Sequence, residues 1–233
     1  MRPGRITRTC PLVLSLVLAP AGAGSATADT LYGIIDEGDH AGYLITIDVS
    51  TGKAEFVGDA GIASACVLAF DSSKDMLLIS NCFGYPGQAY EVDRQTGASL
   101  GVVIDDFSPN DALAYHAASD GLYAVDSGYN DSILVRLDPD SGAWTDDTDV
   151  IQKGPVTALA ADPVSHNLYG IGLKNGQPWL FRITVTQGDA ALPETDIAQV
   201  DRVLDGLAFD RYGKLYATDG DRLCRVDLAN GAV

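Results

Sequence analysis

Two aspartates stand at the same place in a repeated pattern and are the strongest candidates for chemistry. Asp111 and Asp205 each lie two residues before a Leu-Ala dipeptide, and Asn110 adjoins the first of them. Carboxylate and amide oxygens are the ligands that Ca²⁺ prefers. A cation held there would act as a Lewis acid on an ester carbonyl. These three residues form the candidate metal site, provided that the fold brings them together.

The histidines give a weaker signal. His40 lies in a Gly- and Asp-rich loop and His166 in a predicted turn, whereas His116 takes a position that aspartate holds elsewhere in the pattern. No Ser/His/Asp order, phosphate-binding loop or zinc spacing is visible. The sequence therefore indicates no catalytic residue and no organic cofactor.

Two cysteines fall at opposing positions of a predicted hairpin. The hairpin turns near Ser73 and Lys74, which places Cys66 opposite Cys82. Cross-strand spacing suits a disulfide, and disulfides persist in oxidising compartments. We predict a Cys66–Cys82 disulfide, with two buried thiols as the alternative. Cys224 has no evident partner.

The elements that carry these residues repeat along the chain. The Leu-Ala dipeptide begins at Leu68, Leu113, Leu159 and Leu207, at intervals of 45, 46 and 48 residues. Each dipeptide opens three or four short apolar segments separated by Gly and Asp, as in an antiparallel meander. A four-stranded unit of this length is typical of a β-propeller blade. A β-sandwich also has short strands, but it has no reason to keep one side-chain pattern at a constant interval.

The repeat predicts an all-β propeller over residues 29–233. The blades are expected at about 30–58, 65–104, 110–150, 156–200 and 203–233. The first of these lacks an inner strand and the last lacks an outer strand. Unpaired strand edges favour aggregation. Two explanations remain open: the chain is part of a larger ring, or it forms an irregular five-bladed one.

Four turns share the pattern Asp-x-x-(Thr/Ser/Asn)-Gly. They run over 48–52, 93–97, 138–142 and 227–231. Asp accepts hydrogen bonds from backbone N–H groups ahead of it, and Gly adopts the positive φ that ends the turn. The Ca²⁺ loop of an EF-hand needs a distal Glu that is missing here. We therefore interpret the pattern as a structural hairpin turn.

The first 28 residues have the form of a secretory signal peptide. Three arginines precede a short apolar run at 11–19, and small residues at 26–28 suit cleavage before Asp29. The run is too short to span a membrane. We predict a secreted, periplasmic or extracellular, protein.

The chain is strongly acidic, with a formal net charge of −17. Nucleic acids and anionic membranes need a cationic surface. The composition therefore disfavours nucleic acid as a partner and gives no sign of membrane insertion. Partners are expected to be a small molecule or a protein, and a bound Ca²⁺ is compatible with the charge.

Two segments resemble the gluconolactonase-like, or senescence-marker, propeller family. They are Pro109-Asn110-Asp111-Ala-Leu-Ala and Leu204-Asp205-Gly206-Leu-Ala-Phe-Asp, each followed by a Gly-x-Leu-Tyr strand. The blades also resemble those of secreted propellers with LYxID-type and NHL-like repeats. In the gluconolactonase-like family such Asn and Asp residues hold a catalytic divalent metal. The resemblance implies that role for Asp205 first, and for Asn110 and Asp111 second.

Two functions follow from these observations. The first is a secreted propeller that acts as a non-catalytic binding or scaffolding module, since propellers host many unrelated functions. The alternative is a divalent-metal-dependent lactonase or related hydrolase with carboxylates at the mouth of the central channel. The convergence of Asp111 and Asp205 on a common point distinguishes the two.

Overall fold

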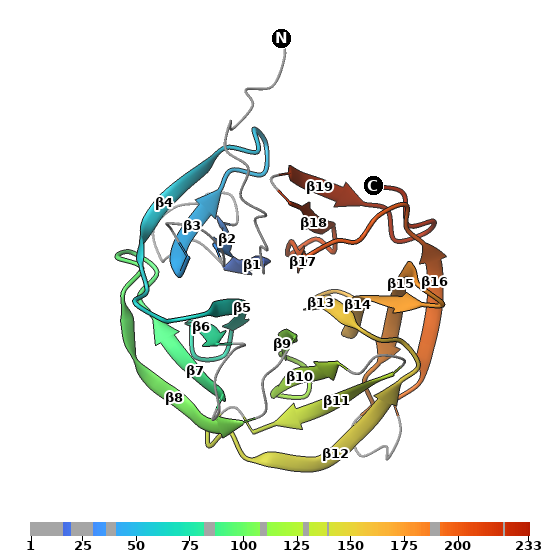
Figure 1. Cartoon of the computed structure of the whole chain (residues 1–233), viewed down its shortest axis with the longest axis horizontal. Helices are drawn as coiled ribbons and strands as arrows, with labels where there is room; N and C mark the ends of the chain where they lie inside the picture. The colour runs from blue at the N-terminus through green and yellow to red at the C-terminus, as the bar shows by residue number, and fades with distance from the viewer. Residues whose placement is uncertain are drawn as a thin grey trace.

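The computed structural model describes residues 16–19, 30–35, 41–81, 87–107, 111–127, 131–138, 140–186, 192–220 and 222–233. They form five small antiparallel sheets in a ring, a five-bladed β-propeller (Figure 1). This architecture confirms the predicted fold class. None of the described residues is helical, so none of them lies in a helix that could span a membrane.

Each sheet is a meander that runs from the channel to the rim. The first holds β1 (Leu16–Ala19), β2 (Thr30–Ile34), β3 (Tyr43–Ile47) and β4 (Ala54–Asp59). The second holds β5 (Ala65–Asp71), β6 (Met76–Asn81), β7 (Gly87–Val92) and β8 (Ser99–Phe107). The third holds β9 (Ala112–His116), β10 (Gly121–Ser127), β11 (Ser132–Leu137) and β12 (Trp144–Ile151).

The last two sheets differ in strand number. The fourth holds β13 (Val156–Ala161), β14 (Asn167–Lys174), β15 (Gln177–Thr184) and β16 (Glu194–Gln199). The fifth has three described strands, β17 (Gly206–Phe209), β18 (Leu215–Asp219) and β19 (Arg222–Val226). The absence of an outer strand after β19 in the described chain agrees with the sequence prediction for the last blade.

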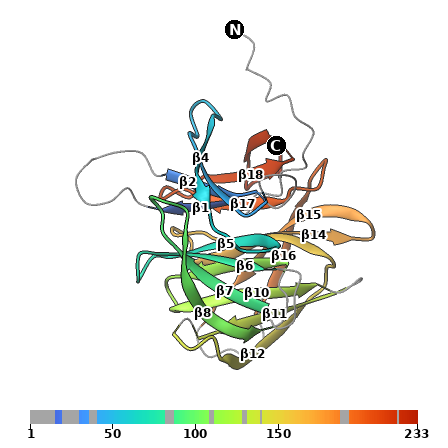
Figure 2. The ribbon, with the colours of Figure 1, turned by 60° about the vertical axis from the view of Figure 1, so that its left-hand side comes forward.

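The first blade differs from the sequence prediction, which left its inner position empty. β1 pairs antiparallel with β2, from Leu16 opposite Gly33 to Ala19 opposite Thr30. It also contacts β5 and β17, so the inner wall of the ring has five strands (Figure 2). The apolar run that was interpreted as part of a signal peptide therefore supplies a strand. Removal of the first 28 residues stays a prediction.

The recurrent Leu-Ala dipeptide is explained by the packing between blades. Successive side chains of a strand point to opposite faces, so each inner strand turns Leu toward the preceding blade and Ala toward the next. Ala114 packs with Leu159, and Ala160 packs with Leu207, in buried clusters between neighbouring sheets. A small side chain opposite a large one lets the inner strands approach closely at the crowded centre.

The four Asp-x-x-(Thr/Ser/Asn)-Gly turns have the predicted structure. In the second blade, Asp93 Oδ1 accepts hydrogen bonds from the N–H groups of Gln95 and Thr96, both at 2.8 Å. Gly97 closes the turn with φ +75° and donates its N–H to the Asp93 carbonyl at 2.8 Å. The other three turns repeat this hydrogen bond. The structural interpretation of these aspartates is confirmed.

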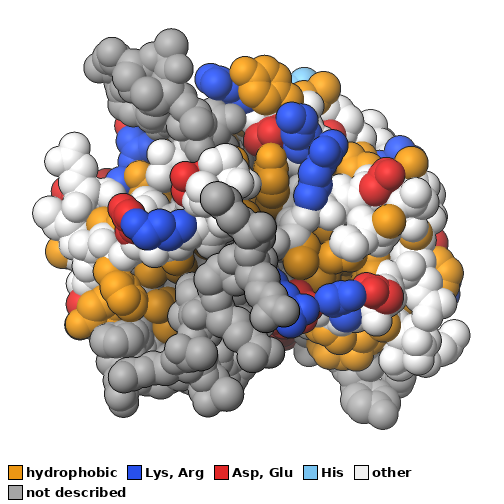
Figure 3. All heavy atoms as spheres, turned by 90° about the horizontal axis from the view of Figure 1, so that it is seen from above, with side chains coloured by type: hydrophobic (Ala, Val, Ile, Leu, Met, Phe, Trp, Pro, Cys, Tyr) orange, Lys and Arg blue, Asp and Glu red, His pale blue; other side chains and the backbone are white. Residues whose placement is uncertain are grey.

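Acidic residues do not form a uniform surface on every side. On the face shown in Figure 3, Lys and Arg side chains lie among Asp, Glu and hydrophobic side chains. Basic side chains therefore interrupt the acidic surface on this face.

Candidate functional site

The inner strands surround a central channel with two mouths. We call the end at which the strands begin the Asp mouth, after Asp111 and Asp205, and the end at which they finish the His mouth, after His116 and His166. Within the described part of the chain, each of four inner strands pairs with one other strand; these are β5, β9, β13 and β17. One edge of each therefore presents backbone N–H and C=O groups to the channel.

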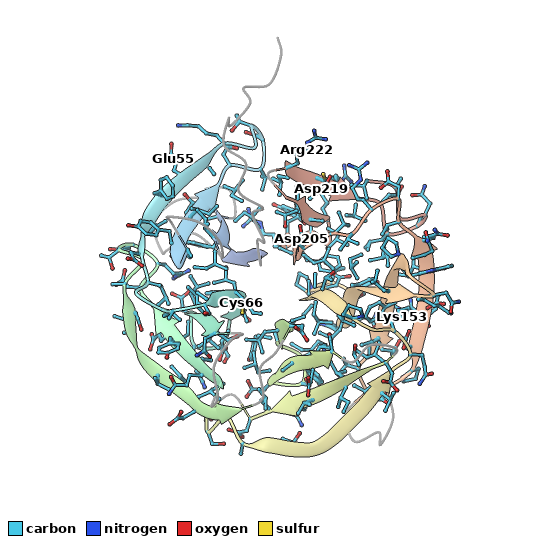
Figure 4. The ribbon with its side chains drawn as sticks, viewed as in Figure 1. Glu55, Cys66, Lys153, Asp205, Asp219 and Arg222 are labelled. Carbon is cyan, nitrogen blue, oxygen red and sulfur yellow. The ribbon has the colours of Figure 1, made fainter. Side chains whose placement is uncertain are left out.

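Asp111 and Asp205 occupy equivalent positions at the Asp mouth, immediately before β9 and β17. The backbone N–H of each donates to the second strand of its own blade, to Val125 and Thr218, at 2.9 Å in both cases. Figure 4 shows Asp205 beside the centre of the ring, as it does Cys66. The structure thus confirms that repetition places these residues at one end of the channel.

Each carboxylate is turned toward its own blade. Asp111 Oδ2 accepts a hydrogen bond from the backbone N–H of Ser127 at 2.9 Å. Asp205 Oδ2 accepts one from Gly220 at 3.2 Å. Burial raises the pKa of both carboxyl groups above the ordinary value, and these backbone donors offset the rise only in part. The two aspartates thus share the same kind of hydrogen bond, although Asp111 is exposed and Asp205 is only partly exposed.

The other two equivalent positions are occupied differently. Cys66 and Thr157 are bulged residues, since the strand register skips each of them. A bulge re-aims a side chain. Thr157 Oγ1 donates to the carbonyl of Leu204 in the next blade at 2.7 Å. A small cavity of about 10 Å³ lies between the described strands at this level.

The predicted Ca²⁺ site stays a prediction, because it has two carboxylates and an amide. Among the described residues, no group of three His, Cys, Asp or Glu side chains comes together as metal ligands. Asn110 lies outside the described residues, so its part in the site stays a prediction.

The structure describes only one of the two cysteines of the predicted disulfide. Ala65 pairs with Asn81, which brings Cys66 next to the residue that precedes Cys82. Cys82 lies outside the described residues, so the pairing stays a prediction. Cys224 on β19 is a free thiol.

The His mouth holds a cavity that the sequence did not reveal. Its volume is about 190 Å³, and it is lined by all four inner strands from β5 to β17 and by the turns that follow β5, β9 and β13. The apolar wall includes Phe70, Leu113, Tyr115, Leu159, Leu207 and Phe209. A cavity of roughly 150 Å³ with an apolar lining accepts benzene, so this one has room for a small ring compound.

His116 at this mouth replaces a turn-capping aspartate. At the equivalent position of the fifth blade, Asp210 Oδ1 accepts hydrogen bonds from the N–H groups of Tyr212 and Lys214. His116 Nδ1 does the same for the N–H of Ser119 at 3.2 Å and also contacts Ser119 Oγ at 2.7 Å. Its Nε2 faces the His166 carbonyl at 3.0 Å. Burial lowers the pKa of His116, which favours the neutral ring, and the hydrogen bonds of the ring join two blades.

Two further buried polar side chains of the cavity wall are also hydrogen-bonded within the protein. Asp162 accepts from Val164 N–H at 2.9 Å through Oδ1 and from Ser165 Oγ at 2.6 Å through Oδ2. Tyr115 donates its hydroxyl to Asp120 at 2.7 Å, and burial is the main cause that raises the pKa of Tyr115 to about 12. The backbone edges of the inner strands supply the hydrogen-bonding groups.

A larger groove of about 510 Å³ lies between the first and second blades. Its one basic residue, Arg94, pairs with Asp75 at 2.5 Å. Arg94 also stacks 5.3 Å from the centroid of the Phe70 ring. Because Arg94 is engaged in both contacts, the channel remains the stronger candidate.

Sequence reasoning found the Asp mouth because identical residue types recur there. It missed the cavity because the lining residues are ordinary core residues. The one available signal was the alternation of Ala with Leu and aromatic residues along each inner strand, which leaves space where four strands meet.

Comparisons with known proteins give the fold. No family model matches the chain, and no curated protein matches it. Solved structures do match. A hydrazine synthase chain from Kuenenia stuttgartiensis is 12% identical, with a TM-score of 0.54 over 93% of this chain, which spans 58% of that chain.

Two further structures are similar over most of the chain. A gluconolactonase from Xanthomonas campestris is 18% identical, with a TM-score of 0.56 over 87% of this chain and 70% of its own. A chain of a nidogen/laminin complex is 12% identical, with a TM-score of 0.61 over 94% of this chain and 77% of its own. These include an enzyme and a binding protein, so at such identities the comparisons show a propeller fold and no function.

Proposed function

We propose that this protein is a secreted binding module that holds a small uncharged molecule in the channel at the His mouth. The observation that carries the proposal is the cavity of about 190 Å³ whose buried polar side chains, Tyr115, His116 and Asp162, are already hydrogen-bonded within the protein. Small-molecule sites are concave and mostly apolar, with a few polar groups that orient the ligand. Here the apolar side chains provide the contact and the strand edges provide the polar groups.

The charge of the ligand follows from the lining. A charged molecule would lose its hydration on entry without gaining a free counter-charge, which is costly in an apolar site. A neutral molecule with an apolar ring loses less hydration free energy on entry, and its ring covers the apolar surface of the cavity wall. The ligand class is therefore a neutral, ring-containing compound with one or two hydrogen-bonding groups.

The test is a ligand screen by saturation-transfer NMR with anionic, cationic and neutral ring compounds of matched size. Benzyl alcohol, benzoate and benzylammonium form one such set. Ala117 lines the cavity, lies in the turn after β9 and is exposed. Ala117→Phe should block the mouth and abolish binding. Ala118→Phe, one residue further along the same exposed turn, should leave it intact.

The outcomes separate the parts of the proposal. Binding of neutral compounds that only Ala117→Phe abolishes supports it. If charged compounds bind and Ala117→Phe abolishes their binding, the site in the channel would be supported, but the proposed neutral ligand class would be wrong. Compounds that still bind to Ala117→Phe, or a screen that finds no bound compound, would overturn the channel site itself.

The second candidate function is the metal-dependent hydrolase. The observation that favours it is the equivalent placement of Asp111 and Asp205, both with a raised carboxyl pKa, at one mouth. Ligands that bind only the native state raise its melting temperature. A thermal melt in millimolar Ca²⁺ against a chelator therefore tests this candidate. A midpoint that rises with Ca²⁺ and does so no longer in Asp205→Asn would support it, and equal midpoints in the wild type would refute it.

A further inference from the structure

The residues that end the inner strands β5, β9, β13 and β17 follow a pattern, an aromatic residue and then Asp. Two departures from it meet at one interface: His116 replaces the Asp in the third blade, and Ala161 replaces the aromatic residue in the fourth. Ala161 packs against the buried cluster that joins these blades, and His116 Nε2 lies 3.0 Å from the His166 carbonyl oxygen. The four pairs are Phe70-Asp71, Tyr115-His116, Ala161-Asp162 and Phe209-Asp210.

The hydrogen bonds of His116 determine which ring nitrogen carries the hydrogen. Nε2 faces the His166 carbonyl oxygen, which can only accept, so Nε2 is the donor. Nδ1 lies 3.2 Å from the backbone nitrogen of Ser119, which can only donate, so Nδ1 is the acceptor. Ser119 Oγ lies 2.7 Å from Nδ1 and donates to it as well. The neutral ring therefore caps its turn as an acceptor, as the aspartates do in the other blades.

A second proton on the ring removes this cap. Nδ1 becomes a donor, and the Ser119 hydroxyl can reverse and accept from it, because Tyr123 Oη lies 3.3 Å from that hydroxyl. The Ser119 N–H cannot reverse, so it faces another N–H and keeps only the His116 carbonyl oxygen at 3.3 Å. An Asp cap stays an acceptor down to about pH 4. The exchange of Asp for His thus makes this turn sensitive to protons in a range where the other turns are not.

The cationic groups around His116 oppose a charged ring. The side chain is 3% exposed and meets the Tyr123 ring edge-on, with the ring centroids 5.9 Å apart. Arg136 on β11 donates to the Ser119 carbonyl oxygen at 2.8 Å. Burial is the largest cause that lowers the pKa of His116, and the charges of His166 and Arg136 lower it further, against the backbone hydrogen bond to His166, which raises it.

The carboxylates of the neighbouring elements do not compensate this charge. Asp120, in the same turn, accepts from the Tyr115 hydroxyl at 2.7 Å. Asp162, across the interface, accepts hydrogen bonds within its own turn. Neither carboxylate is among the causes that shift the pKa of His116. Because His116 lines the cavity at the His mouth, its protonation places an uncompensated charge in the cavity wall.

We propose that His116 is a proton-sensitive switch of the channel, which caps the third-blade turn while neutral and weakens ligand binding at the His mouth when protonated. This regulation rests on the proposed function, since it acts on the ligand of the same cavity. A charged group in the wall favours water over a neutral apolar molecule. Binding and protonation therefore oppose each other, and each changes the equilibrium of the other by the same factor.

The first measurement needs no ligand. The imidazole signals of the full chain are titrated by NMR from about pH 8 to about pH 4.5, and the His116 signal is identified by its loss in His116→Asp. Hydrogen exchange of the Ser119 amide is followed over the same range. The Tyr212 amide is the control, because Asp210 caps it at 2.9 Å. The protection of Ser119 relative to Tyr212 should fall about fivefold, with the midpoint of the His116 titration.

The second measurement is the affinity for benzyl alcohol over the same pH range. Below the His116 midpoint of the free protein, Kd should rise about tenfold per pH unit, as expected for one linked proton. Bound benzyl alcohol should shift the His116 midpoint to lower pH. In His116→Asp, which has the cap of the other blades, the ratio of the Kd values at about pH 8 and about pH 5 should stay near one.

Three results would overturn the proposal. Constant protection of Ser119 through the His116 titration would show that the ring does not hold the turn. A Kd that stays constant while His116 titrates would show that protonation and binding are not coupled. Global unfolding at a higher pH than the protonation of His116 would show that no switch operates in the folded protein.

Failure of the proposed function would give a different result. If the wild type binds no neutral ring compound at about pH 8, the channel site is wrong and no ligand is released by protonation. The Ser119 measurement still shows in that case whether His116 is a proton-sensitive cap.

Discussion

Lys153 offers the sharpest test of the energetics of this propeller. It lies in the linker between β12 and β13, and its side chain is only 1% exposed (Figure 4). Its Nζ contacts Glu194 Oε1, lies 2.5 Å from Asp196 Oδ1 and is 4.9 Å from the centroid of the Phe181 ring. Both carboxylates belong to β16, so Lys153 attaches the linker to the outer strand of the fourth blade.

The perturbation is Lys153→Met, which keeps the apolar volume of the side chain and removes its charge. Removing one partner of a buried ion pair costs about 3–5 kcal/mol. Glu194 and Asp196 are 16% and 29% exposed, so water reaches the orphaned carboxylates, and Lys174 still pairs with Asp196. We therefore expect a loss of about 2–4 kcal/mol. For a domain of this size that loss corresponds to a fall of about 4–16 °C in Tm.

The assay is chemical and thermal unfolding of the full chain, with a double-mutant cycle. Glu194→Gln removes the second charge, so the double variant should recover part of the loss. A coupling energy of about 0.5–3 kcal/mol is expected for residues in one network. A Lys153→Met variant within about 0.5 kcal/mol of the wild type, the range of ordinary surface substitutions, would refute the reasoning.

The pH dependence gives an independent check on this network. Burial raises the pKa of Asp196, but the hydrogen bonds from Lys153 and Lys174 outweigh it, so the pKa is lowered overall. A lowered carboxyl pKa contributes stability above the unfolded-state value, near 4, which is lost as the pH falls through the folded-state value. Lys153→Met should weaken this acid dependence. An identical acid profile for variant and wild type would contradict the assignment.

Three further predictions concern the turns, the Asp mouth and the first blade. Asp210→Ala removes a buried acceptor of two backbone N–H groups and should cost about 1–3 kcal/mol. The same change at exposed Asp227 should cost clearly less in denaturant unfolding, and equal losses would contradict the role of burial. Because burial raises the pKa of Asp205, its contribution to stability is full below the unfolded-state pKa and is lost as the pH rises through the folded-state value. The free energy of unfolding of Asp205→Asn should therefore rise relative to that of the wild type as the pH increases from 3 to 7. A difference in this free energy that stays constant with pH would argue against a raised pKa. Deleting residues 1–28 removes β1 and bares the inner edge of β2, so it should lower the thermal midpoint; an unchanged midpoint would show that β1 adds no stability.

Much of the architecture could be predicted from the sequence because local sequence patterns determine the strands and turns. The repeat interval, the strand lengths and the Asp-to-Gly turns depend on residues within one blade. Asp48, Asp93, Asp138 and Asp227 were assigned to turns from spacing alone, and each turn has the expected hydrogen bond. The predicted metal site depended on distances between blades, which no local pattern encodes.

The β1 strand illustrates the limit of pattern reading. Leu16–Ala19 is part of an apolar run that suits a signal peptide and an inner strand equally well, because both require short apolar segments. Only the ring shows that the inner edge of β2, between β5 and β17, takes a strand at this position.

The sequence by itself determined the repeat, the order of strands and the residues that begin each inner strand, since these are set by short-range hydrogen bonding and alternating hydrophobicity. The tertiary structure decided what those residues do. It turned Asp111 and Asp205 toward their own blades, made His116 the cap of a turn that aspartate caps in other blades, and opened a cavity at the His mouth. These features arise where separate blades meet, and their geometry depends on the closure of the whole ring.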